Sequence, residues 1–166
     1  MKNSPDSPTK HAETPSTSKQ ASRQRLQDDP CSVARALSDV GDWWSLLIVR
    51  QAMYGTRRYV DFQQQLGIAK NILGDRLSRL VENEVLKKVD VGEHGQRFEY
   101  RLTPKGKDLF TVLVALRQWG DRWNRRDDEA PLRMVDRRLG QPLQDIQVLD
   151  AEGQPVGIND VLSLPR

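Results

Sequence analysis

The spacing of hydrophobic residues predicts that ordered structure begins near residue 31 with two consecutive helices. Apolar side chains recur at helical intervals over residues 33–40, and Gly41 closes that segment. Asp42 is well placed to cap a second helix, which is expected over residues 43–53. The second helix is apolar on every side, so we expect it to be buried.

Two further helices joined by a short turn are predicted next. Thr56 is expected to cap the first of them, residues 57–66, which is short and amphipathic. Gly67 makes the turn, and the following helix begins at about Ala69 with leucines along one face. Its other face is polar and carries Lys70, Asn71, Gly74, Asp75, Ser78 and Arg79.

The hydrophobic period then changes from helical to alternating, which predicts a two-stranded hairpin. Residues 87–91 and 97–102 are the expected strands, and the glycine-bounded segment 92–96 is the expected tip. Thr103-Pro104 next favours a helix start, because a capping hydroxyl followed by proline is typical of the first helical position. That last helix is expected to reach Arg125.

The last helix carries two apolar stripes, which require two packing partners. One stripe can face the chain's own core, and the other most simply packs on the same helix of a second copy. We therefore expect a homodimer. Its interface is predicted to include Leu109, Val112, Leu113, Leu116, Trp119 and Trp123.

The two ends of the chain differ from this middle segment. Residues 1–30 are rich in polar residues and proline and poor in apolar side chains, so a disordered N-terminal arm is expected. Residues 127–166 are expected to form an acidic extension, with a weak β-hairpin around a turn at residues 150–153. Residues 31–126 then make up the single folded domain.

The distribution of charge also singles out the middle segment. The net charge is +1 over residues 1–30, +6 over residues 31–126 and −4 over residues 127–166, which suggests a polyanion partner for the middle only. With one cysteine and two histidines, neither a metal site nor a cofactor is expected. No apolar run is long enough for a membrane span or a secretory signal, so we expect a cytoplasmic protein.

The order of elements predicts a mainly α (α+β) fold, a winged helix-turn-helix with a long C-terminal dimerisation helix. In that arrangement the helix that begins near Ala69 enters the major groove of double-stranded DNA, which is wide enough to admit one helix. An amphipathic surface helix with solvated charges would give the same pattern, and that interpretation stays open at this point.

Five short motifs follow one another between residues 31 and 106. They are Cys31-Ser32-Val33-Ala34, Gly41-Asp42-Trp43-Trp44-Ser45-Leu46-Leu47-Ile48, Arg58-Tyr59-Val60-Asp61-Phe62, Ile72-Leu73-Gly74-Asp75-Arg76-Leu77-Ser78-Arg79-Leu80 and Phe98-Glu99-Tyr100-Arg101-Leu102-Thr103-Pro104-Lys105-Gly106. Together they resemble the HxlR-type winged helix-turn-helix transcriptional regulators. The resemblance implies a cytoplasmic homodimer that binds operator DNA through two recognition helices and two wings. Glu84 departs from the family's usual glycine, so Asn83 is expected to take the left-handed cap position unless the helix runs on.

The predicted recognition helix and wing supply the candidate DNA contacts. The side chains that match base edges are Lys70, Asn71, Asp75 and Ser78, and Gly74 permits a close approach of the backbone. Phosphate contacts are expected from Arg57, Arg58, Arg79 and Arg97. Arg76 belongs to the same set, and an ion pair inside the domain with Asp75, Glu82 or a wing carboxylate is its alternative role.

Cys31 is a redox-sensing candidate. It lies at an expected helix start and four residues from Arg35, and a helix N-terminus beside a cation favours the thiolate form. Some members of the resembling family use a cysteine at this place to sense oxidants or electrophiles. The other interpretation is a small side chain buried at the dimer interface.

The sequence also bears on three other possible functions: catalysis, binding of a small-molecule effector, and binding of another protein. An enzyme is not expected, because the chain has no phosphate-binding glycine loop, nucleophile elbow or metal cluster. Trp43, Trp44, Trp119 and Trp123 could line a pocket for an apolar small-molecule effector, or could simply be core. A winged-helix protein-interaction module without specific DNA binding is the alternative, although a basic surface has no role in a protein-only interface.

Overall fold

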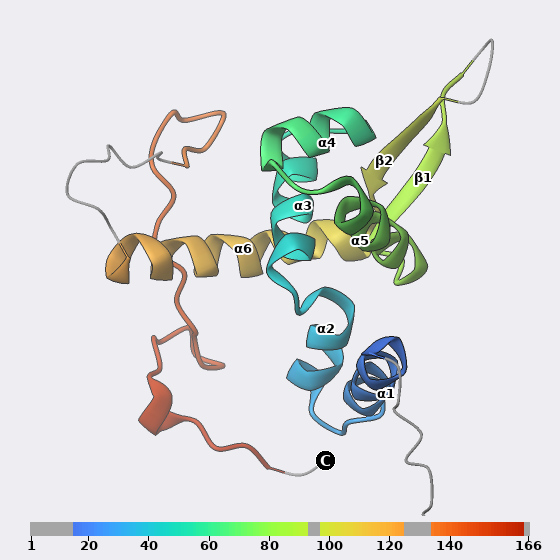
Figure 1. The fold of residues 1–166 in the computed structure, drawn as a ribbon. Coiled ribbons are helices and arrows are strands. Elements are labelled where there is room, and N and C mark those ends of the chain that lie inside the picture. The colour runs from blue at the N-terminus through green and yellow to red at the C-terminus, as the bar shows by residue number, and fades with distance from the viewer. Residues whose placement is uncertain (1–14, 93–96, 125–133, 165–166) are drawn as a thin grey trace, which may run out of the picture. The chain divides into compact units, whose positions relative to one another are not determined.

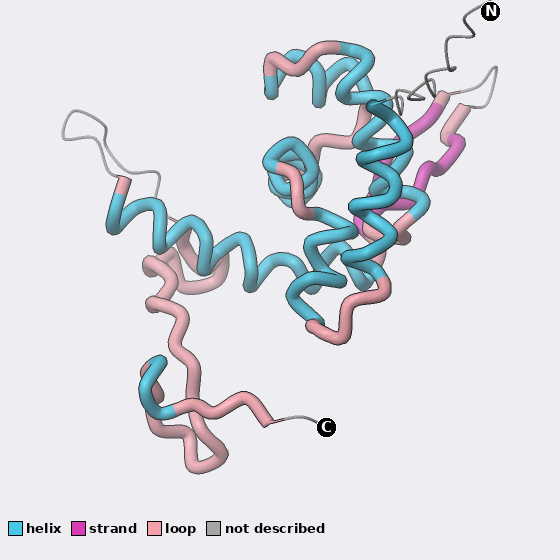
Figure 2. Tube along the Cα trace, turned by 60° about the horizontal axis from the view of Figure 1, so that its bottom comes forward, coloured by secondary structure: helices cyan, strands magenta, loops and turns pink. Residues whose placement is uncertain are grey.

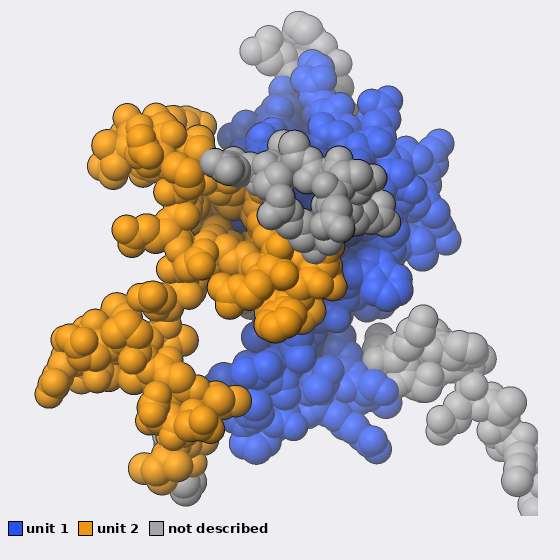
Figure 3. Space-filling model, turned by 90° about the vertical axis from the view of Figure 1, so that its left-hand side faces the viewer, with its two compact units in different colours: residues 1–103 blue, residues 104–166 orange. Residues whose placement is uncertain are grey.

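The computed structural model of the 166-residue chain describes residues 15–92, 97–124 and 134–164 (Figure 1). The chain divides into two compact units, residues 1–103 and residues 104–166 (Figure 3). This division falls elsewhere than the boundaries expected at residues 30 and 126, and the roles assigned to those three segments stay a prediction. No helix among the described residues is long and apolar enough to cross a membrane.

The described residues of the first unit form five helices and a small sheet. The helices are α1 (Pro15–Gln27), α2 (Ser32–Val40), α3 (Trp43–Met53), α4 (Tyr59–Leu66) and α5 (Lys70–Glu82), and the strands are β1 (Leu86–Asp90) and β2 (Phe98–Leu102). The strands pair antiparallel, with Leu86 opposite Leu102 and Asp90 opposite Phe98 (Figures 1 and 2). The predicted fold class, a mainly helical winged helix-turn-helix, is confirmed.

Helix α1 corrects the expectation that residues 1–30 are disordered throughout. Residues 15–27 are helical, and Arg23 in this helix donates a hydrogen bond from Nε to the Ser38 carbonyl of α2 at 3.0 Å. Composition argues against order in an isolated segment, because little apolar surface can be buried. A neighbouring helix supplies the contacts that the segment itself lacks.

The caps of helices α3 and α4 agree only in part with those predicted from the sequence. Asp42 caps α3 as predicted, accepting hydrogen bonds from the Ser45 backbone N–H at 3.0 Å and from the Ser45 hydroxyl at 2.6 Å. Thr56 does not cap α4, which begins two residues later than expected, and its hydroxyl instead donates to Gln65 Oε1 at 2.7 Å. Gly67 ends α4 at φ +61, the left-handed conformation that glycine adopts without steric cost.

The core of the first unit is formed by one face each of α3, α4 and α5, together with the start of β1. Its fully buried side chains include Ile48, Val49, Phe62, Leu73, Leu77, Leu80 and Leu86. The expectation that α3 is buried on every side is wrong at its start, because Trp43 is 74% exposed. Phe62 packs edge-on against Tyr100 of β2, with 6.5 Å between ring centroids, and so links the sheet to the helices.

The chain passes from α5 to β1 through an unusual backbone conformation. Helix α5 ends at Glu82, Asn83 has φ −85, and Glu84 itself adopts φ +56. The expectation that Asn83 takes the left-handed position, or that the helix runs on, is therefore wrong. A non-glycine residue at this φ is held there against a local steric cost, and the Thr103 hydroxyl, which donates to the Glu84 carbonyl at 2.5 Å, helps to hold it.

The described part of the second unit comprises helix α6 and an extension, residues 134–164, with little regular structure (Figure 2). Helix α6 spans Pro104–Trp123, so it ends before the expected Arg125, which lies outside the described residues. In the extension, isolated bridges join Val135 to Pro142 and Leu149 to Pro155. The turn expected at residues 150–153 is present, but single bridges replace the predicted hairpin strands and a 3₁₀ helix, η1 (Ile158–Asp160), replaces the return strand.

Candidate nucleic-acid interface

Helix α4, the turn at Gly67 and helix α5 form a helix-turn-helix whose second helix presents its polar face outward. The Tyr59 hydroxyl of α4 donates a hydrogen bond to the Lys70 carbonyl at 2.6 Å, which fixes the start of α5 against α4. No side chain caps α5, because its N-cap residue is Ala69. The first-turn amides of α5 therefore lack a side-chain cap and can donate to an anion such as a DNA phosphate.

The predicted base-contacting residues lie together on the exposed side of α5. Lys70, Asn71, Asp75 and Ser78 are exposed, whereas the leucines of the opposite face are buried. Within the described part of the chain, the side chain of Asn71 makes no hydrogen bond. An exposed carboxamide near the start of such a helix retains the donor and acceptor that a bidentate contact to adenine requires.

Arg76 and Asp75 belong to a network of ion pairs that ties α5 to the start of α3. Arg76 Nε lies 2.9 Å from Asp42 Oδ1, Arg76 also pairs with Asp75, and Arg79 Nε lies 3.2 Å from Asp75 Oδ2. The Arg76 side chain is only 21% exposed. Arg76 therefore occupies the intradomain role that was its alternative. Asp42 is a partner that the sequence analysis did not identify.

We expect Asp42→Ala to lower the free energy of unfolding by about 1–2 kcal/mol. The change removes the α3 cap, which is typically worth about 1 kcal/mol, while the half-exposed ion pair with Arg76 adds little because water screens it. Urea unfolding measures the effect. Asp108→Ala, at an exposed carboxylate on α6, should change stability by less than about 0.5 kcal/mol, and an equal loss in both variants would contradict the capping role.

Gly74 leaves open space on the outer part of α5. A Cβ built at this position would meet only the Tyr59 hydroxyl, at an ordinary contact distance of 3.9 Å. Packing inside the chain therefore does not require glycine here, although a glycine in a helix interior costs roughly 1 kcal/mol relative to alanine. This is consistent with the predicted close approach of a partner at Gly74.

The two arginines before α4 differ in their surroundings. The half-buried Arg57 donates from its guanidinium to the carbonyls of Ala52 and Thr56, at the end of α3, and its own carbonyl accepts from the Tyr100 backbone N–H at 2.8 Å. The structure thus places Arg57 in an internal contact between α3 and the wing. Arg58 is exposed and lies at the N-cap of α4.

The β1–β2 wing presents basic side chains, including two that the sequence analysis did not select. Arg97 is exposed, and so are Lys87 and Lys88, with Lys88 Nζ 3.9 Å from the centroid of the Phe98 ring. The available signal for these lysines was their charge on a predicted wing strand. The wing turn is organised by Asp90, whose carboxylate accepts from the backbone N–H groups of Gly92 and Arg97, and these two bonds hold its pKa below the ordinary value.

Tyr100 lies on the inner side of the wing. Burial raises the pKa of its hydroxyl, and Tyr59 adds to the rise. The Tyr100 hydroxyl therefore stays neutral to a higher pH than an ordinary tyrosine does, which suits the packing of its ring on Phe62.

Cys31 is exposed and occupies the N-cap position of α2. Its backbone N–H donates to Asp29 Oδ1 at 2.7 Å. The Arg35 guanidinium donates to the Asp29 and Pro30 carbonyls at 2.7 and 2.8 Å and to the Ser32 hydroxyl at 3.1 Å. The predicted helix start is thus present at Cys31, Arg35 lies in the first turn of that helix, and the Cys31 side chain is exposed.

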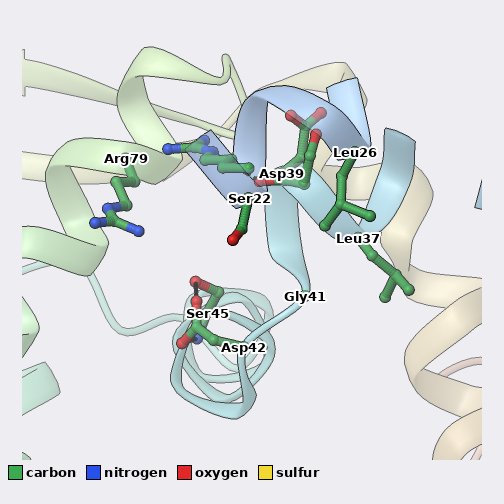
Figure 4. A pocket seen from close by; sticks show the side chains of 10 residues that line it. Ser22, Leu26, Leu37, Asp39, Gly41, Asp42, Ser45 and Arg79 are labelled. Atoms are coloured by element: carbon green, nitrogen blue, oxygen red, sulfur yellow. Dashed lines mark hydrogen bonds between the residues drawn. The ribbon is translucent and has the colours of Figure 1, made fainter. Parts of the chain in front are cut away.

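A pocket of about 300 Å³ lies beside α5 in the first unit (Figure 4). It is lined by polar groups from α1, α2, α3 and α5, among them Ser22, Asp39, Asp42 and Arg79, with Leu26 and Leu37 at its edge. None of the four tryptophans lines it. Among the described residues, no group of His, Cys, Asp or Glu side chains could hold a metal ion.

Helix α6 exposes the stripe that was predicted to bind a second copy. Val112, Leu116, Trp119 and Trp123 are 49–68% exposed, and Leu109 and Leu113 are partly exposed. Helix α2 likewise exposes Val33 and Leu37, at 66% and 50%. Large apolar side chains that remain exposed at helical spacing are typical of a protein interface.

Comparison with known proteins gives consistent matches to helix-turn-helix regulators. The model of the HxlR-like helix-turn-helix family matches residues 39–128. The uncharacterised HTH-type transcriptional regulator Rv3095 of Mycobacterium tuberculosis is 41% identical over 110 residues, which cover 66% of this chain and 70% of that protein.

Solved structures extend the likeness beyond the family segment. The crystal structure of PA1607, a candidate transcription factor, matches with a TM-score of 0.80 and 45% identity, covering 84% of this chain and 98% of that one. The reduced form of the transcriptional regulator YodB from Bacillus subtilis matches with a TM-score of 0.50 and 28% identity, covering 57% and 95% of the two chains.

Proposed function

The chain belongs to the HxlR-like helix-turn-helix family of transcriptional regulators, and on that premise we propose that it binds a specific DNA operator as a homodimer. The observation that carries the proposal is the outer face of α5. This face holds exposed Lys70 and Asn71 at an N-terminus without a side-chain cap, and Tyr59 and Asp42 anchor the helix behind it. Such a helix can enter a major groove without rearrangement.

The proposal assigns different roles to the predicted DNA-contacting residues. Lys70, Asn71, Asp75 and Ser78 face the base edges, with Gly74 admitting the DNA to the helix backbone. Arg58, Arg79, Arg97 and the first-turn amides of α5 contact phosphates. Arg57 and Arg76 act inside the domain, because their guanidinium groups are bonded to α3 and to Asp42 and Asp75. The protein would act in the cytoplasm, where it meets the DNA.

The direct test is recovery of bound fragments from fragmented genomic DNA with the purified full-length protein. We expect a small set of enriched fragments that share an inverted repeat. Its half-sites should lie about 10 bp or a multiple apart, because that spacing returns the major groove to the same face of the duplex. Recovery of fragments without a shared sequence would contradict operator binding and would support the alternative, a winged-helix module that binds protein.

We also propose that Cys31 makes DNA binding responsive to oxidants or electrophiles. The support is its exposure at the start of α2 and the likeness to YodB, whose solved structure is described as a reduced form. Peroxide would oxidise the thiolate to a sulfenic acid, which can condense with Cys31 of a second copy to give a disulfide and water.

We expect peroxide or an electrophile to weaken operator binding of the wild type by at least about tenfold, and reductant to restore the oxidised form. Cys31→Ser should bind the operator normally and respond to neither treatment. Fluorescence anisotropy with a labelled operator measures both proteins. An equal response of mutant and wild type would assign Cys31 a purely structural role.

A further inference from the structure

The C-terminal extension, residues 134–164, has a defined conformation without a core of its own. Three carboxylates hold its turns: Asp136 accepts from Arg138 N at 2.8 Å, Asp150 accepts from Gln154 N at 2.8 Å, and Asp160 accepts from Gly157 N at 2.7 Å. No side chain in residues 134–164 is buried. Hydrogen bonds to exposed turns contribute little net stability, so a segment of this kind needs a surface to pack on.

The extension carries many large apolar side chains, and they are exposed. In order they are Val135, Leu139, Ile146, Val148, Leu149, Ile158, Val161, Leu162 and Leu164. Ile158 is 92% exposed and Leu162 is 86% exposed. Large apolar side chains exposed in this number are typical of a segment that packs on a partner surface.

A glutamine on α6 anchors the extension next to the dimerisation stripe. Gln118 donates from Nε2 to the Gln144 carbonyl at 2.9 Å and accepts at Oε1 from the Ile146 backbone N–H at 2.8 Å. These two hydrogen bonds hold the backbone on both sides of Asp145. The Asp145 carboxylate Oδ2 in turn lies 3.5 Å from Arg122 Nη2. Trp119 and Trp123 follow Gln118 and Arg122 directly in the sequence, so the anchor lies in the C-terminal half of α6 together with the last residues of the exposed stripe.

The anchor also places the extension far along the helix. Gln118 is 14 residues after Pro104, which corresponds to about 21 Å of helix at 1.5 Å per residue.

The charge of the extension is one-sided, because residues 140–165 contain four carboxylates and no Lys, Arg or His, whereas residues 31–126 have a net charge of +6. A second copy would offer the extension both an apolar stripe and a basic domain.

We propose that residues 134–164 form an arm that packs on a second copy of this chain, extending the interface made by the α6 stripe. This inference rests on the homodimer of the proposed function. Each copy contributes one arm, so a two-fold dimer contains the contact twice.

The test uses a photo-crosslinking amino acid, p-benzoylphenylalanine, in place of Ile158 of the full-length chain. Copies carrying this probe are ¹⁵N-labelled, mixed with unlabelled wild type at a concentration that permits subunit exchange, and irradiated without DNA. We expect crosslinked peptide pairs that join one labelled and one unlabelled segment. Crosslinks found only within the labelled chain would overturn the proposal, because the arm would then pack on its own copy.

A second measurement follows the strength of the dimer. Ile158→Asp combined with Leu162→Asp should raise the dimer dissociation constant at least tenfold in sedimentation experiments, and Gln118→Ala should raise it by releasing the anchor. Ser163→Asp, which adds one charge at an exposed polar position of the same segment, is the matched control and should change it less than threefold. Unchanged dimerisation in the first two variants would contradict the arm.

These outcomes separate this inference from the proposed function. A dimer that binds its operator but gives only intrachain crosslinks contradicts the arm and leaves the regulator intact. A wild-type protein that neither dimerises nor selects a DNA sequence contradicts both.

Discussion

Replacing Leu116 and Trp119 by aspartate is expected to convert the proposed homodimer into monomers and to abolish tight operator binding. Both side chains are about half exposed in the single chain, at 49% and 56%, so the substitutions should leave the monomer folded. In a two-fold dimer each change occurs twice, and each replaces apolar contact with a charge that must be desolvated. A loss of at least roughly 4 kcal/mol of association free energy follows, or about a thousandfold in Kd.

Sedimentation at micromolar concentration measures the oligomeric state, and circular dichroism checks the fold of the variant. Thr111→Asp adds a charge to the same helix away from the stripe, and it should remain dimeric. Operator affinity should fall with dimerisation, because a monomer contacts one half-site only. A monomeric wild type would contradict the interpretation of the α6 stripe, and so would a double mutant that stays dimeric.

The second large effect is expected at Asn71 on the outer face of α5. Asn71→Ala should reduce affinity for the best operator by about 1–3 kcal/mol and relax the preference at one base position in each half-site, because a bidentate carboxamide contact to a base is lost. The side chain makes no hydrogen bond among the described residues, so the fold should not change. Binding to a library of operator variants measures both the affinity and the preference.

Arg97→Ala is the matched comparison on the wing. Loss of the Arg97 guanidinium should weaken binding to all DNA sequences alike and lower the slope of log affinity against log salt concentration by about 1 per phosphate contact removed. If Asn71→Ala instead lowers affinity equally for operator and random DNA, α5 is not the specificity helix. The protein-interaction alternative would then gain support.

Local sequence signals determined most of the architecture. The Asp42 cap, the glycine turn before α5, the leucine face of α5 and the alternation of the wing all depend on residues close together in the chain. Caps and periodicity act over a single turn or strand, so they can be recognised before any packing is known. The exposed face of α5 follows directly, because residues opposite a buried leucine stripe must face outward.

Tertiary structure alone decided which arginines have partners inside the chain. Arg76 finds Asp42, 34 residues away, and the Arg57 guanidinium reaches the end of α3, where it donates to the Ala52 and Thr56 carbonyls. Helix α1 likewise forms beside α2, where the Ser38 carbonyl accepts from Arg23. Sequence shows that these arginines carry charge. Their partners depend on how separate elements pack, and only the folded chain brings such distant groups within hydrogen-bonding distance.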